Sequence, residues 1–185
     1  MTPVHHWMSW VSGVDLTAST QPGISLPNVI CHVARMVQTP VGSAASGLIY
    51  WQPDPEGPPA LAAFVSTDPE GVGAYFGPHI FAGTPFEHAP VLAADITIHR
   101  HDDEARSVVQ VMGHVFETTM RGIGTPSLIH RAATEESPFA QQGIEQSASS
   151  VTFSVDGTII PMAVVQETMM GSYGAVYSAA GAYAR

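Results

Sequence analysis

The sequence predicts an α+β fold, in which a largely antiparallel sheet packs against one helical layer. Three observations support this class: short apolar runs bounded by proline and glycine fill the first half of the chain, an amphipathic helical pattern follows, and strand-like runs return near the C-terminus. The chain of 185 residues has the length of one domain. Its composition, 45% hydrophobic and 12% charged residues, is that of a chain that folds.

The first 27 residues differ from the rest, and we assign them to an N-terminal segment docked on a single α+β domain formed by residues 28–185. The segment is rich in serine, threonine, proline and glycine. Four of its apolar residues would share one face of a short helical turn, namely Val4, Trp7, Met8 and Val11. We expect this face to dock on the core, and an anchor for a partner is the alternative.

Four strands are predicted between residues 29 and 99. They cover 29–38, 47–52, 60–66 and 91–99, each bounded by proline or glycine. The tetrapeptide DPEG at 54–57 and again at 68–71 has proline at the second turn position and glycine at the fourth, as type I turns favour. A meander of antiparallel strands is therefore expected.

Residues 103–121 are predicted to form a long helix. At 100° per residue, one face collects Val108, Val109, Val111, Met112, Val115, Phe116, Thr119 and Met120, while the opposite face is polar. Read as a strand, each face would mix the two kinds of residue. Asp102 can cap the start of this helix, and Gly122 can end it.

Two shorter helices are predicted over about 126–147, and strands follow them. Thr125 and Ser137 each precede a proline, which places a capping hydroxyl before the first helical position. A hairpin is expected around Asp156-Gly157, with strands at 151–155 and 158–166, and a last strand at 173–180. The small residues of the tail let it pack closely on its own sheet or on another subunit, so we expect a homo-oligomer.

Composition excludes several functions. The chain contains no lysine, so a Schiff base or a Walker-type phosphate loop is excluded. The net charge of −10 and the scattered arginines argue against nucleic acid or an anionic membrane as partner. Cys31 is the single cysteine and is expected to be a buried, inert thiol. With no apolar run of membrane-spanning length and no signal-like N-terminus, a cytoplasmic location is expected.

Three residues form a candidate site for a divalent metal. On a strand over 91–101, Asp95, His99 and His101 share the face opposite the apolar residues. Two histidines and a carboxylate on one side of a strand can supply ligands to a first-row metal. The alternative is an ordinary solvated strand face, on which aspartate and histidine are common.

Two further groups are candidates for catalysis and for ligand binding. His114 and Glu117 lie three apart on the polar face of the predicted helix and could act as a general base with its orienting partner. The segment GPHIFAGTPFEHAP has the composition of a loop that lines a pocket or covers it. The candidate ligand-binding residues are Phe76, directly before this segment, and His79, Phe81, Phe86, Glu87 and His88 within it.

Two functions are consistent with these features. The first is a non-catalytic module that binds a small ligand or a protein partner through tyrosine, phenylalanine and methionine side chains. The second is a small metal-dependent or histidine-based enzyme acting on a neutral or cationic metabolite, since the charge of the protein would not repel such a molecule.

Overall fold

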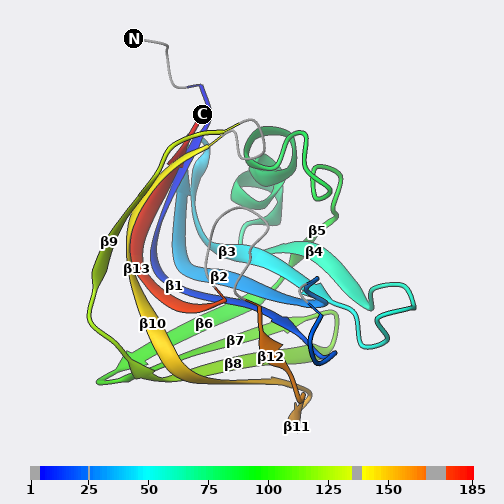
Figure 1. The fold of residues 1–185 in the computed structure, drawn as a ribbon. Coiled ribbons are helices and arrows are strands. Elements are labelled where there is room, and N and C mark those ends of the chain that lie inside the picture. Colours follow the sequence, from blue (N-terminus) through cyan, green and yellow to red (C-terminus); the bar gives the residue numbers. More distant parts are fainter. Residues whose placement is uncertain (1–4, 25, 135–138, 166–173) are drawn as a thin grey trace.

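The described part of the chain is almost entirely β-structure. The computed structural model describes residues 5–24, 26–134, 139–165 and 174–185. These contain thirteen strands and one helical segment at 69–80, in which π-helical turns η1 (Pro69–Gly73) and η2 (Phe76–Ile80) flank residues 74–75 (Figure 1). The strands are β1 (Trp7–Ser19), β2 (Val29–Thr39), β3 (Gly42–Trp51), β4 (Leu61–Ser66), β5 (Val91–Ala93), β6 (Asp95–His101), β7 (Glu104–Val111), β8 (His114–Ile123), β9 (Ser127–Arg131), β10 (Ala140–Val155), β11 (Thr158–Ile159), β12 (Ala163–Val164) and β13 (Ala175–Ala184). The expected α+β class is wrong.

The strands form one curled, half-barrel sheet (Figure 1). Its main path is β5-β4-β3-β2-β1-β13-β10-β8-β7-β6, and β9, β11 and β12 pair beside this path. The two ends of the path, β5 and β6, are separated in the chain by Ala94 alone. The predicted strand at 91–99 is therefore two strands on opposite edges, and the curl of the sheet brings these edges together.

Strands β1 to β3 are covered on both faces, which creates two cores. On one face lie β6 to β8, folded back across β1 to β3. The first core fills this space, and its largest side chains include Leu16, Ile49, Phe116, Met120 and Phe153. On the other face lie the helical segment and the loop after it. The second core fills that space and includes Trp10, Leu48, Phe64, Phe76, Ile80, Phe81 and Phe86.

The predicted helix at 103–121 is a hairpin formed by β7 and β8. In β7 every second residue is buried, as shown by Ala105, Ser107 and Val109. Met112 and Gly113 form the connecting turn, and both have positive φ, 51° and 81°, as in a type I′ turn. A helical projection cannot distinguish a helix from a strand here, because apolar residues at consecutive positions are compatible with both the helical period of about 3.6 and the strand period of two. Their β-branched side chains and this turn favour the strand.

The turn offers a test of this correction. Because Met112 has a left-handed backbone and is 73% exposed, Met112→Asn is expected to raise the free energy of unfolding by about 0.5–1 kcal/mol. Urea denaturation measures the change. Leu128→Asn, at an exposed position of β9, is the control and should give no gain. A loss of stability in Met112→Asn would contradict the hairpin.

The two shorter helices predicted over 126–147 are also absent from the described residues. Residues 127–131 form β9 and residues 140–155 form β10, while 135–138 lie outside the described part. The polar sequence of β10 has no clear period, but β13, β8 and β9 supply its hydrogen-bond partners. Pairing with strands distant in sequence therefore overrides the capping pattern.

The other elements agree more closely with the sequence. The strands expected at 29–38, 47–52 and 60–66 are confirmed as β2, β3 and β4, and the hairpin at Asp156-Gly157 joins β10 to β11. The helical turn expected near the N-terminus is wrong for residues 7–19, which form β1 between β2 and β13. Val4 lies outside the described residues.

Candidate functional site

A change of side-chain alternation in β1 brings the residues of the candidate site to one face of the sheet. Ser12 has a φ of 55°, in the left-handed region, and the faces of β1 exchange there. As a result Trp10 and Asp15, which lie five residues apart, both line the same pocket. Two other strands also have register shifts. In β2 the shift relative to β3 lies between Ala34 and Val37, and in β10 the shift relative to β13 lies between Ile144 and Glu145.

The pocket lies between this face of the sheet and the segment that carries the helix and the following loop. Its volume is about 80 Å³, enough for several water molecules or a small organic group. Most of the wall is apolar and aromatic, formed by Met8, Trp10, Ile30, Val33, Ala34, Val37, Leu48, Phe76, Phe81, Phe86 and Tyr183. The polar residues are Asp15, Thr17, His32, Ser46 and Gln141. An apolar pocket with a few polar groups is the usual form of a small-molecule site.

Asp15 is the exceptional residue of the pocket. It lies on β1 directly opposite His32 of β2, and its side chain is half-buried. Among the described residues its carboxyl group has no hydrogen-bond or ion-pair partner. Burial, together with the nearby charge of Glu145, raises the pKa of Asp15 to about 8. The carboxyl group is therefore mostly protonated at pH 7.

His32 lies beside Asp15 and is also uncharged. The Thr17 Oγ1 and His32 Nε2 atoms are 2.9 Å apart, and Thr17 is buried. Burial lowers the pKa of His32 to about 4, because the charged ring would lose its hydration. The polar end of the pocket thus presents a neutral acid, a neutral imidazole and a hydroxyl. Perturbed groups in a pocket of this kind indicate a functional site.

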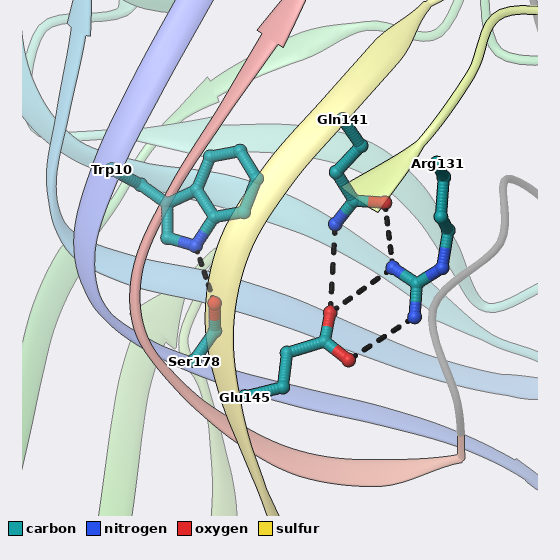
Figure 2. A network of polar contacts seen from close by, with 5 residues as sticks. All are labelled: Trp10, Arg131, Gln141, Glu145 and Ser178. Atoms are coloured by element: carbon teal, nitrogen blue, oxygen red, sulfur yellow. Dashed lines mark hydrogen bonds and ion pairs between the residues drawn. The ribbon is translucent and has the colours of Figure 1, made fainter. Parts of the chain in front are cut away.

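A second polar cluster, formed by Arg131, Gln141 and Glu145, adjoins the pocket through Gln141 (Figure 2). The Arg131 guanidinium contacts both carboxylate oxygens of Glu145 at 3.2 Å and donates to Gln141 Oε1 at 2.7 Å. Nearby, the Trp10 indole donates to Ser178 Oγ at 2.7 Å. The charge of Glu145 is therefore paired, and the position of Trp10 is fixed by a buried hydrogen bond.

The pKa of Asp15 predicts a dependence of stability on pH. The folded-state pKa of about 8 lies above the ordinary 3.8, so the stability present below pH 3.8 is lost as the pH rises towards 8. Asp15→Asn cannot ionise and avoids this loss. We compare the free energy of unfolding of Asp15→Asn with that of wild type at each pH. The difference, in favour of the variant, is expected to grow by on the order of 3 kcal/mol as the pH rises from 5 to 8.

Urea denaturation of both proteins across this range measures the gain, and comparison at each pH cancels the titration of other groups. The effect of pH on the stability contribution of His32 is opposite to that of Asp15. Because the pKa of His32 is lowered in the folded state, its contribution is present above pH 6.5 and is lost as the pH falls towards 4. A difference between Asp15→Asn and wild type that stays constant from pH 5 to 8 would contradict the raised pKa.

Only some of the ligand-binding residues proposed from the sequence line the pocket. Phe76, Phe81 and Phe86 line the pocket. His79 instead stacks on His6, with ring centroids 4.7 Å apart, and lies against the tilted ring of Tyr75 at 4.5 Å.

Glu87 and His88 do not line the pocket either. The Glu87 Oε2 atom accepts a hydrogen bond from the Gly83 N–H at 2.7 Å, within the loop itself. The side chain of His88 is exposed.

The metal candidates Asp95, His99 and His101 lie on the exposed face of β6, as the alternation predicted. Within the described ranges, no group of three or more histidine, cysteine, aspartate or glutamate side chains is placed to hold a metal ion. His101 Nδ1 instead lies 3.2 Å from the carboxylate of Asp102. Within the described part of the chain, these three side chains are therefore not brought together as a metal site.

His114 and Glu117 do not share a face, because they lie on a strand and not on a helix. Three residues apart on β8, they point to opposite faces. His114 Nδ1 lies 2.8 Å from Asp156 Oδ2, and Glu117 is paired with Arg106 at 2.6 Å. This pairing lowers the pKa of Glu117, which makes its carboxylate a weaker base.

Sequence reasoning did not select Asp15 or His32. Each interrupts an apolar run, Val14-Asp15-Leu16 and Cys31-His32-Val33, and this interruption was the available signal. A polar residue among apolar residues on a strand covered on both faces must lie in a core or a pocket. The fact that β1 and β2 are covered on both faces became known only from the structure.

The chain matches no protein-family model, no curated protein and no solved structure. The pocket around Asp15 is therefore the feature that bears on function. The helical segment found within the described residues is too short and too polar to cross a membrane.

Proposed function

We propose that this protein binds a small, largely apolar molecule in the pocket, with one hydrogen-bonding group of that molecule placed against Asp15, Thr17 and His32. The single observation that carries the proposal is the group of polar side chains, Asp15, Thr17 and His32, in an otherwise aromatic and aliphatic pocket. Apolar contacts supply affinity in such sites, and a few polar groups fix the orientation of the ligand.

The arrangement of the polar groups supports this mode of binding. The protonated carboxyl of Asp15 can donate a hydrogen bond, and the neutral ring of His32 has one nitrogen that accepts and one that donates. Thr17 is already bonded to the Nε2 atom of His32, which orients the ring. A ligand that reaches these groups replaces water in a site where an unpaired polar group is costly.

The proposal is tested by nuclear magnetic resonance with benzyl alcohol as the added ligand. The ring of Trp10 is part of the pocket wall, so the signal of its indole N–H, which donates to Ser178, reports binding. This signal is identified by its absence in Trp10→Phe. Benzyl alcohol is expected to shift this signal to saturation. We expect Ala34→Leu, which extends a side chain from the wall, to weaken the affinity about tenfold or more.

The matched control is Ala182→Leu, the same substitution at an exposed position of β13. It should leave the affinity unchanged. Equal affinity in Ala34→Leu and wild type, or no response of the Trp10 signal in wild type, would overturn the proposed binding site.

A further inference from the structure

In the part of the chain that the structure describes, Asp15 has no positively charged partner, whereas three glutamates do. Within the described residues, Glu104, Glu117 and Glu145 each bind an arginine, at 2.9, 2.6 and 3.2 Å. Asp15 is half-buried in a pocket, and no arginine is present among the lining residues. Arg131, on β9, does not line this pocket and is bound to Glu145 and Gln141. Within the described ranges, no arginine is placed to pair with Asp15, so we consider a bound molecule as the source of a cation.

We propose that the pocket selects a primary amine carried on a small apolar body, with its ammonium group placed against the Asp15 carboxylate. This inference rests on the proposed function, because it identifies the chemical class of the ligand in the same pocket. An ammonium group has three N–H donors, and Asp15, Thr17 and His32 offer acceptors at one end of the pocket.

The rest of the pocket suits an organic cation as well. Trp10 and Tyr183 lie with their ring centroids 4.9 Å apart on the wall, and aromatic faces attract ammonium groups. The net charge of −10 raises the local concentration of cations and repels anions. An anionic ligand would instead meet Asp15 and, beyond it, Glu145.

Binding of an amine is coupled to the protonation of Asp15. At pH 6 about 1% of a carboxyl with a pKa of about 8 is ionised, and at pH 7 about 10%. Because the ammonium binds the ionised form, its affinity rises with pH until Asp15 is fully ionised. Among the described residues, the titratable groups around Asp15 are His32 of β2, Tyr183 of β13 and Glu145 of β10, the last of which is bound to Arg131 of β9. Burial, together with the nearby charge of Asp15, raises the pKa of the Cys31 thiol on β2 to about 11, so this thiol stays protonated from pH 6 to 8. His32 remains neutral from pH 6 to 8 because its pKa is about 4.

The experiment compares benzylamine with benzyl alcohol, which have the same hydrocarbon body, through the Trp10 indole signal of the full chain at pH 6, 7 and 8. In wild type, the affinity for benzylamine should rise about tenfold from pH 6 to 7 and exceed that for benzyl alcohol about tenfold at pH 8. The affinity for benzyl alcohol should not rise with pH.

Asp15→Asn is the matched variant, since asparagine has the size of a protonated aspartate and no charge. Within this variant, benzyl alcohol is the reference ligand, and the affinity for benzylamine relative to it should lose both its excess at pH 8 and its rise with pH. In wild type, a benzylamine affinity that is equal at pH 6 and 8, or no higher than that of benzyl alcohol, would overturn the amine inference and leave the proposed function standing. If neither compound shifts the signal, both proposals fail.

Discussion

Phe64→Ala is expected to lower the free energy of unfolding by about 3–5 kcal/mol, among the largest effects of any single substitution in this protein. Phe64 is fully buried on β4, facing the second core. Its ring centroid lies 5.5 Å from that of Phe76 and 4.8 Å from that of Phe81. Both neighbours belong to the pocket wall, so the substitution leaves a cavity directly behind the candidate site.

Urea denaturation measures the loss of stability in Phe64→Ala, and Leu128→Ala is the control. Leu128 is 87% exposed on β9, so its truncation should change stability by less than about 0.5 kcal/mol. Phe64→Ala should also weaken benzyl alcohol binding, because the aromatic wall loses its support. A loss of less than about 1 kcal/mol would show that the helical segment does not pack on β4 as described.

Gly47→Ala is expected to cost about 3 kcal/mol for a different reason, namely the lack of space for a methyl group. A Cβ atom at Gly47 would lie 2.7 Å from the Val33 Cα atom and would overlap the His32 carbonyl oxygen. These atoms belong to the backbone of β2, so they cannot move without disturbing the pairing of β2 with β3. Since His32 is part of this backbone, the pocket should be distorted as well.

Gly124→Ala is the matched control for this effect. There the nearest atom to an added Cβ is the Ser147 carbonyl oxygen at 3.4 Å, an ordinary contact. We expect Gly124→Ala to change the urea midpoint little. If the two alanine variants had equal stability, the close approach of β2 and β3 at Gly47 would be refuted.

The candidate site was predictable only in part. Phe76, Phe81 and Phe86 were selected from the sequence because aromatic residues in a loop rich in glycine and proline suggest a pocket wall, and the structure places all three on the wall. Asp15 and His32 were not selected, since their importance depends on the pairing of β1 with β2 and on what covers that face.

The sequence by itself determined the strands β2, β3 and β4, the outward face of β6 and the hairpin at Asp156-Gly157. In each case the signal is local, because alternation and turn chemistry act within a few residues. The tertiary structure alone decided that residues 103–121 form a hairpin and that β5 and β6 lie on opposite edges. It also placed Asp15 in a pocket. These outcomes depend on hydrogen bonds and burial between segments far apart in the chain, which local periodicity does not encode.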